Sequence, residues 1–409
     1  MRNHPEDWKS MTLGELLAAT GGSIKTGPFG TILKASEYST EGVPIISVGE
    51  VGYGSLRVSE STPRAPHQVV ERLPEYRLRS GDIVFGRKGA VDRSAWVTPR
   101  EDGWFLGSDG IRLRLAPTLD TRFIAYQIQS SSARQWLLQH ATGSTMLSLS
   151  RRVLENLPVI VPPIAVQHAI SDVLAALDDK IAANRKLAAT AESLLSARFA
   201  ELSIDVDHGD QISLDNYFEL NPKCSKPISD EPTYLDMQKL PASEILVSEW
   251  GRRPGKGGTR FTNGDVLLAR ITPCLENGKV GYVDFLDDGE VALGSTEYIV
   301  LRARSGVPRE LAYFLAKSPR FRSTAIQHMV GTSGRQRLSA ADVAGFTVRQ
   351  VDSDVLEEWG RLSSPLVKHL GSLRNENRTL AAVRDTLLPR LMSGELRVRD
   401  AEKSVEAVL

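Results

Sequence analysis

Two stretches of the sequence, about residues 166–200 and 355–392, carry the same heptad pattern, and this repeat limits the folds open to the chain. The first stretch places side chains at alternating spacings of four and three residues, at Ile170, Leu174, Leu177, Ile181, Asn184, Ala188, Ala191 and Leu195. The second keeps this rhythm at Leu366, Leu370, Leu373, Asn377, Leu380, Leu387 and Leu391, with Arg384 as an interruption. Such a row of side chains is the seam of a helix that packs lengthwise against another helix.

The two seams match each other in detail. Asn184 and Asn377 stand at the same place in the rhythm, and the pair Leu194-Leu195 matches Leu387-Leu388, all at an offset of 193 residues. A helix of about 35 residues is about 50 Å long, which is more than the core of one small domain needs. We therefore expect the two helices to pack against each other as an antiparallel coiled coil, in which a buried asparagine in each seam fixes the register.

The sequence before each helix repeats as well. Gly81-Asp82-Ile83-Val84 matches Gly264-Asp265-Val266-Leu267 at an offset of 183 residues, and an arginine stands six residues after each glycine. Later matches keep their order along the chain, which chance matches would not do. Each Gly-Asp pair is typical of a turn in which the carboxylate caps the backbone before a strand. Strands predominate up to residue 115, and helical spacing runs from Thr121 to His140.

These patterns predict an α+β fold in which two similar mixed α/β globular domains are joined by the two long helices, with internal pseudo-twofold symmetry. A chain of 409 residues is long enough for two such domains. The expected parts are a first globular domain at 1–163, a first helix at 164–204, a second globular domain at 205–352, a second helix at 353–395 and a C-terminal tail at 396–409.

The charges of the chain balance, because Lys and Arg together number 50 and so do Asp and Glu. A generic attraction to polyanions is therefore excluded, and any nucleic-acid surface must be local. The two cysteines, Cys224 and Cys274, form no C-x-x-C pair, which argues against a disulfide scaffold and a zinc site and favours a reducing cytoplasm. No apolar run has the length of a signal or a membrane span, so we expect a soluble protein.

Several signatures of enzymes fail on inspection. The stretch 251–257 resembles a phosphate-binding loop but has one residue too few between its glycines and lacks the Ser or Thr after Lys256. Asn221-Pro222 begins like the base-holding motif of amino-methyltransferases, but a second proline and an aromatic residue are missing. No dinucleotide or adenosylmethionine loop follows a strand, and the seven histidines show no metal-ligand spacing. We therefore expect no catalytic residue and no metal site.

The sequence feature that remains as a candidate for function is local positive charge in glycine-rich loops. Arginines and lysines in such loops suit contacts with phosphates, and arginine also recognises guanine in the major groove. The alternative is a solvated loop with incidental charge, but the set occurs at matching places in both halves. The predicted DNA-binding residues are Lys25, Arg87, Lys88, Arg93, Arg252, Arg253, Lys256, Arg260, Arg270, Lys279, Arg335 and Arg337. The predicted helix-pair interface comprises Leu174, Leu177, Ile181, Asn184, Leu195, Leu370, Leu373, Asn377, Leu380 and Leu387.

Several motifs in both halves of the sequence fit one family pattern. In the first half they are Thr26-Gly27-Pro28-Phe29-Gly30 and Gly143-Ser144-Thr145, with Pro162-Pro163 and Gln167 after them. In the second half they are the stretches 270–279 and 387–396. Through these motifs the chain resembles, over nearly its full length, a specificity subunit of a type I restriction-modification system. The second half departs from the pattern, because it has Glu219-Leu220-Asn221-Pro222 in place of the Thr-Gly-Pro-Phe-Gly loop.

The resemblance implies two target-recognition domains, each of which reads one half of a bipartite, asymmetric site in double-stranded DNA. It implies that the helices set the spacing of the half-sites and dock two modification subunits. S-adenosylmethionine would bind to those methyltransferase subunits, and this chain would need no cofactor and perform no catalysis. Whether restriction subunits with nuclease and translocase activity also join is left open.

Two other interpretations compete with a role in DNA recognition. One is a coiled-coil interaction scaffold that never touches DNA, which the neutral net charge favours slightly and the repeated basic loops oppose. The other is an enzyme in its own right, such as a nuclease or methyltransferase, which the missing cofactor loop and catalytic cluster oppose.

Overall fold

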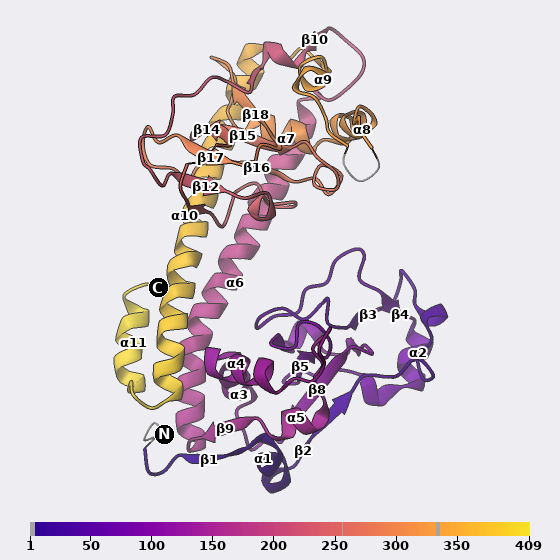
Figure 1. Ribbon diagram of the computed structural model, residues 1–409, viewed down its shortest axis with the longest axis vertical. Coiled ribbons are helices and arrows are strands. Elements are labelled where there is room, and N and C mark those ends of the chain that lie inside the picture. The colour runs from indigo at the N-terminus through magenta and orange to yellow at the C-terminus, as the bar shows by residue number, and fades with distance from the viewer. Residues whose placement is uncertain (1–4, 256, 333–335) are drawn as a thin grey trace. The chain divides into compact units, whose positions relative to one another are not determined.

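The computed structural model describes residues 5–255, 257–332 and 336–409. The chain forms two compact units, which divide both long helices near their middles. Unit 1 comprises Met1–Lys180 and Thr379–Leu409, and unit 2 comprises Ile181–Arg378. The mixture of helices and small sheets confirms the α+β class predicted from the sequence (Figure 1).

The described residues of unit 1 form three small sheets. An antiparallel pair joins β1 to β9, a four-stranded sheet has the order β2-β8-β5-β6, and a three-stranded sheet has the order β4-β3-β7. The strands are β1 (Lys9–Thr12), β2 (Gly22–Thr26), β3 (Val43–Ile46), β4 (Arg64–Ala65), β5 (Ile83–Gly86), β6 (Ser94–Trp96), β7 (Phe105–Leu106), β8 (Gly110–Leu115) and β9 (Pro158–Val161). The helices that belong wholly to this unit are α1 (Leu13–Thr20), α2 (His67–Arg72), α3 (Thr121–Gln129), α4 (Ser131–His140), α5 (Arg151–Glu155) and α11 (Val398–Glu406).

Unit 2 repeats this order of strands. Its sheets are β10-β19, β11-β18-β15-β16 and β13-β12-β17-β14, and β12 runs parallel to β17 as β3 does to β7. The strands are β10 (Gln211–Ser213), β11 (Phe218–Leu220), β12 (Thr233–Leu235), β13 (Gly251–Arg252), β14 (Thr259–Phe261), β15 (Val266–Ala269), β16 (Val280–Tyr282), β17 (Ala292–Gly294), β18 (Tyr298–Ala303) and β19 (Thr347–Arg349). The helices are α7 (Leu311–Lys317), α8 (Pro319–Gln327) and α9 (Ala340–Ala344). The shared topology gives the internal sequence repeat a structural basis.

Short 3-10 helices fill some of the connections in both units. They are η1 (Ala35–Glu37), η2 (Pro74–Tyr76) and η3 (Pro99–Glu101) in unit 1, and η4 (Leu214–Asn216) and η5 (Met237–Lys239) in unit 2.

The helical segment expected from Thr121 to His140 consists of two helices, α3 and α4, because Ser130 interrupts it. The Ser130 backbone leaves the helical conformation, and its hydroxyl accepts a hydrogen bond from the Ala133 amide as the cap of α4. Such capping is a strong preference of serine and competes with continued helix. The periodicity therefore predicted helical structure correctly, but it did not predict the break at Ser130.

The long helices α6 (Ile164–Glu201) and α10 (Ser353–Met392) lie alongside each other within each unit (Figure 1). In unit 2 the two helices run antiparallel. Asn184 of α6 donates a hydrogen bond to Asn377 of α10, whereas Phe199, which comes later in α6, packs edge-on against Trp359, which comes earlier in α10. In unit 1 the Arg384 guanidinium, which interrupts the second seam, pairs with Asp178 at 2.7 Å. The interruption therefore has a partner on the other helix.

The predicted seam residues face inward. Nine of them are buried, and Asn377 is half-buried; the buried set is Leu174, Leu177, Ile181, Asn184, Leu195, Leu370, Leu373, Leu380 and Leu387. In unit 2 the seam is continuous with the core of the globular part, because Leu195, Leu370 and the strand residue Leu268 belong to one hydrophobic cluster. The helix pair thus helps to form the domain core as well as its own interface.

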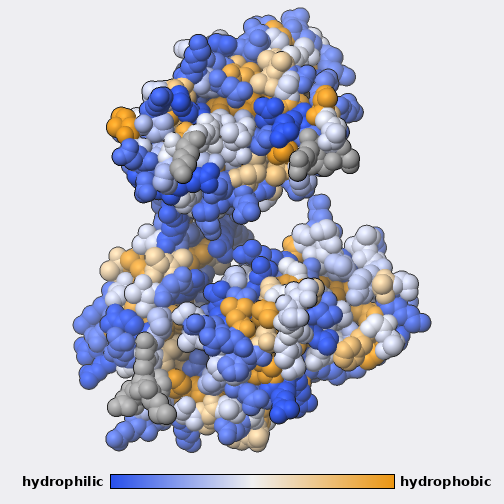
Figure 2. Space-filling view, viewed as in Figure 1, coloured by the Kyte–Doolittle hydropathy of each residue, from blue (hydrophilic) through white to orange (hydrophobic). Residues whose placement is uncertain are grey.

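On the face drawn in Figure 2, hydrophilic residues predominate and hydrophobic residues form small, separate patches. Among the described residues, no helix combines the length and the hydropathy needed to cross a membrane.

Candidate nucleic-acid interface

In unit 1, Arg87 is the residue around which three loops meet. It follows β5, and its guanidinium lies 5.2 Å from the centre of the Phe29 ring. Its N–H donates to the Asp109 carbonyl at 2.8 Å, and its carbonyl accepts from the Leu149 N–H at 2.8 Å. The Phe29 side chain is 56% exposed, so an aromatic face and a guanidinium lie together at the surface. This combination suits contacts with a phosphate backbone or a base.

Close packing explains the glycines of these loops. A Cβ on Gly27 would lie 1.7 Å from the Gly107 carbonyl oxygen, so the Thr-Gly-Pro-Phe-Gly loop can approach the loop before β8 only with glycine at this position. Gly143 has a φ of 112°, and a Cβ there would lie 2.2 Å from the Met146 carbonyl oxygen. The sequence motifs that carried the family resemblance in this half therefore hold the loops around Arg87.

A second cluster in unit 1 surrounds Tyr53. Its ring is 51% exposed, and the guanidinium groups of Arg134 and Arg93 lie 4.1 and 5.6 Å from its centre. The Tyr53 hydroxyl donates to Asp92 at 2.8 Å, and Arg134 pairs with the same carboxylate at 3.0 Å. Burial opposes ionisation of Asp92, but the hydrogen bonds from Arg134 and Tyr53 outweigh it and lower the pKa of Asp92. Sequence reasoning missed Tyr53 and Arg134, since no local pattern links two residues so far apart.

Unit 2 builds the same backbone arrangement around Arg270. The Arg270 N–H donates to the Glu297 carbonyl at 3.0 Å, and the Arg270 carbonyl accepts from the Leu338 N–H at 2.8 Å. These bonds correspond to those that Arg87 makes with Asp109 and Leu149. The arginines predicted to be equivalent from the sequence therefore occupy equivalent backbone positions.

The side chains around Arg270 form an ion-pair cluster. Arg337 donates to Glu297 with Nη2 at 2.7 Å and with Nε at 3.0 Å, and Arg270 lies 3.8 Å from the same carboxylate. The hydrogen bond from Arg337 lowers the pKa of Glu297, and the positive charges of both arginines add to the effect. Glu297 thus stays ionised and holds two of the predicted DNA-binding arginines together.

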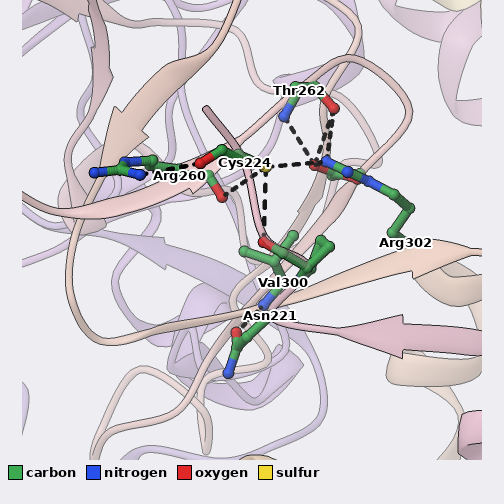
Figure 3. A network of polar contacts seen from close by, with 8 residues as sticks. Asn221, Cys224, Arg260, Thr262, Val300 and Arg302 are labelled. Carbon is green, nitrogen blue, oxygen red and sulfur yellow. Dashed lines mark hydrogen bonds and ion pairs between the residues drawn. The ribbon is translucent and has the colours of Figure 1, made fainter. Parts of the chain in front are cut away.

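The loop that replaces Thr-Gly-Pro-Phe-Gly in unit 2 is fixed by side chains (Figure 3). Asn221 has a φ of 48°, its N–H donates to the Val300 carbonyl at 2.8 Å, and its Oδ1 accepts from the Val300 N–H at 3.0 Å. Arg260 donates to the Cys224 carbonyl at 3.0 Å, and Arg302 lies 3.4 Å from the Cys224 sulfur. The amide oxygen of Asn221 is therefore used inside the fold.

Buried aspartates anchor the strands behind both sets of loops. Asp82 and Asp265 are each 1% exposed, and each accepts from a backbone N–H at the preceding turn, as expected for a capping carboxylate. Each also binds an arginine through two hydrogen bonds of 2.7 Å, Arg114 for Asp82 and Arg302 for Asp265. The repeat in the sequence thus includes a buried ion pair that the turn pattern alone did not predict.

The other residues predicted to bind DNA differ in the contacts that their charged groups already make within the protein. Lys25 lies over the Tyr76 ring at 4.7 Å, and Lys88 pairs with Asp109 at 3.2 Å. Arg252 and Arg253 are exposed and pair with Asp287 and Asp236 at 3.9 and 3.3 Å. Lys279 donates to the carbonyls of Met237 and Gln238, so its ammonium is used within the fold. Lys256 and Arg335 lie outside the described residues.

The described part of the chain offers no cluster of three His, Cys, Asp or Glu side chains that could hold a metal ion. The cysteines Cys224 and Cys274 are free thiols. The side chains that we find in the candidate interface are arginines, aromatic rings and carboxylates.

Comparison with known proteins shows which proteins this chain is similar to. Residues 5–193 match the family model of the type I restriction modification DNA specificity domain. The chain is 32% identical over 129 residues to the type I restriction enzyme EcoAI specificity subunit of Escherichia coli, an alignment that covers 29% of this chain and 21% of that protein. It is 33% identical over 137 residues to the EcoEI specificity subunit of the same organism, covering 31% and 22%. The chain thus spans about a fifth of the length of these two relatives.

More distant relatives align along the whole chain. The MjaIX specificity subunit of Methanocaldococcus jannaschii is 20% identical over 433 aligned positions, which cover 97% of this chain and 95% of that protein. The crystal structure of the type I restriction-modification system S subunit from M. genitalium has a TM-score of 0.58 at 17% identity and covers 96% of this chain and 97% of that one. That likeness shows a shared fold. Residues 5–193 thus match the type I restriction modification DNA specificity domain, and the chain is similar to type I restriction-modification specificity subunits, as its sequence motifs predicted.

Proposed function

We propose that this chain is the sequence-specific DNA-binding subunit of a type I restriction-modification complex, in which each globular part reads one half of a bipartite, asymmetric target. The observation that carries the proposal is the equivalence of Arg87 and Arg270. Both follow the second strand of a repeated sheet, and both hold their loops through the same backbone hydrogen bonds. A repeat of this kind supplies two similar readers in one chain, and different side chains around each arginine allow the two to read different bases.

Contacts of loop arginines with phosphates would supply salt-dependent affinity, and a minority of side chains that reach base edges would supply specificity. Phe29 and Tyr53 add exposed aromatic faces beside arginines in the first reader. The long helices would set the spacing of the half-sites and offer the surface on which two modification subunits dock. Restriction subunits would join the same complex where the system includes them.

Catalysis would belong to the partners. We assign no catalytic residue and no cofactor to this chain, and S-adenosylmethionine would bind to the modification subunits. These would flip the target adenine out of the duplex for methylation. The chain would thus determine which adenines are modified.

A binding experiment on the full chain tests the proposal. Duplex DNA of mixed sequence should bind at low salt, and affinity should fall steeply between about 50 and about 200 mM salt, because phosphate contacts release counterions. Binding in the complex with modification subunits should become selective for one bipartite sequence. Absence of binding at low salt would contradict the proposal and favour an interaction scaffold that does not touch DNA.

A further inference from the structure

The predicted DNA-binding loops carry less free positive charge than their sequences suggest. Five of the ten described DNA-binding residues predicted from the sequence already have a carboxylate partner, in the pairs Lys88–Asp109, Arg252–Asp287, Arg253–Asp236, Arg270–Glu297 and Arg337–Glu297. A surface that binds phosphates non-specifically would leave such cations unpaired. The pairing therefore calls for a physical reason.

Asp109 and Glu297 come from the same point of the repeated fold. Asp109 directly precedes β8 and Glu297 directly precedes β18, and their carbonyls accept the N–H groups of Arg87 and Arg270. The two carboxylates bind cations from different loops. Asp109 binds Lys88, which directly follows Arg87, whereas Glu297 binds Arg337, which belongs to a different loop from Arg270. A carboxylate beside the basic loop is thus common to both units, although the detailed contacts differ.

We infer that Asp109 and Glu297 are matched specificity-determining residues that suppress non-sequence-specific attraction of DNA to the two readers. The inference rests on the proposed function and deepens it. Each carboxylate neutralises loop cations in the free protein, and its negative charge repels a phosphodiester that approaches the loop. DNA therefore binds tightly only where base contacts add enough favourable free energy to offset the loss or sharing of these ion pairs.

The exposed fractions of the side chains fit this role. Glu297 is 23% exposed and Arg337 46% exposed, so the pair is accessible to DNA without being freely solvated. Charges in such a setting interact more strongly than in bulk water, and loss of one carboxylate charge near the DNA changes affinity by roughly 3- to 10-fold. A purely structural role would instead require Glu297 only as an acceptor of hydrogen bonds.

The variant Glu297→Gln separates these roles, because glutamine keeps the shape and an acceptor oxygen but removes the charge. Asp109→Asn makes the same change in unit 1. Glu357→Gln is the matched control: Glu357 is 65% exposed, pairs with Arg361 on the surface of α10, and yields the same change in net charge. Thermal unfolding of each full-length variant establishes that it is folded.

The measurement is the affinity of each full-length chain for a random-sequence duplex at several salt concentrations. We expect Glu297→Gln and Asp109→Asn each to bind about 3- to 10-fold more tightly than the wild-type chain, with Glu357→Gln unchanged. The slope of log affinity against log salt should become steeper by about 0.9, since one more cation contacts phosphate. In the complex with modification subunits, both variants should methylate additional sites that differ from the main target.

The outcomes distinguish the inference from the function on which it rests. If the wild-type chain binds the duplex and both variants match it, or if both bind more weakly, the carboxylates do not suppress non-specific binding and the inference is wrong. Equal tightening by Glu357→Gln would show an effect of net charge alone and would also overturn it. If the wild-type chain does not bind even at low salt, the proposed function fails, and the inference fails with it.

Discussion

Replacing Asn184 by alanine would test whether the buried asparagine holds the two long helices together in unit 2. Asn184 is 4% exposed, and its Nδ2 donates to Glu376 at 2.9 Å and to Asn377 at 3.1 Å. A hydrogen bond to a carboxylate contributes about 1.5–3 kcal/mol and a neutral one about 1 kcal/mol. We therefore expect Asn184→Ala to lower the free energy of opening this part of the helix pair by about 2–4 kcal/mol.

Amide hydrogen exchange measures this change locally, which matters because a chain of two units need not unfold in one step. Amides of residues 181–200 and 361–378 should exchange about 30- to 700-fold faster in Asn184→Ala, the factor that corresponds to 2–4 kcal/mol. Amides of β8 in unit 1 serve as an internal reference. Lys186→Ala is the control variant, since Lys186 lies on the exposed side of the same helix.

Unchanged exchange in both segments would refute the reasoning, because it would mean that the Asn184 contacts add nothing to helix pairing. A double variant, Asn184→Leu with Asn377→Leu, separates stability from register. An apolar seam should be at least as stable as the asparagine pair, whereas the helices should lose their single alignment. Slower exchange together with heterogeneous pairing is the expected result.

Three further changes have defined outcomes. Asp265→Ala should destabilise unit 2 by about 2–4 kcal/mol in chemical unfolding, because it leaves a half-buried guanidinium without its bidentate partner; an unaltered transition would contradict this. Arg270→Ala should weaken duplex binding several-fold in a gel shift, whereas Glu402→Ala on α11 should not; equal binding would exclude Arg270 from the interface. Arg337 lowers the pKa of Glu297, so the stability that this ionised group adds is present at neutral pH and lost as the pH falls through its folded pKa. The difference in melting temperature between the wild-type chain and Glu297→Gln should therefore shrink in acid, and a constant difference would disprove the linkage.

The helices could be predicted because their signal is local and periodic. Spacings of four and three residues through Leu174, Leu177 and Ile181 define a seam wherever the rest of the chain lies. The equivalence of the two halves could also be predicted from the sequence, since Arg87 and Arg270 stand at the same distance from matching glycines. The first prediction rests on a pattern within a few dozen residues, and the second on short motifs that recur 183 residues later.

The electrostatics of the site could not be predicted in this way. The partners Arg337 and Glu297 are 40 residues apart, and Tyr53 and Asp92 are 39 apart, so only the folded chain brings them together. Basic loops in a sequence indicate positive charge but not its neutralisation. Lys279 illustrates the difference, because its ammonium donates to backbone carbonyls and not to solvent.

The most direct test of the proposed role in target selection is a map of methylated adenines across the genome of the source cell, with this gene present, deleted and restored. We expect a set of adenines that share one bipartite sequence to lose methylation on deletion and to regain it on restoration. Restoration with the Arg87→Ala variant should recover methylation poorly, while Glu402→Ala should recover it fully. A methylation map that does not change when the gene is deleted would contradict the proposal that this chain selects the DNA target.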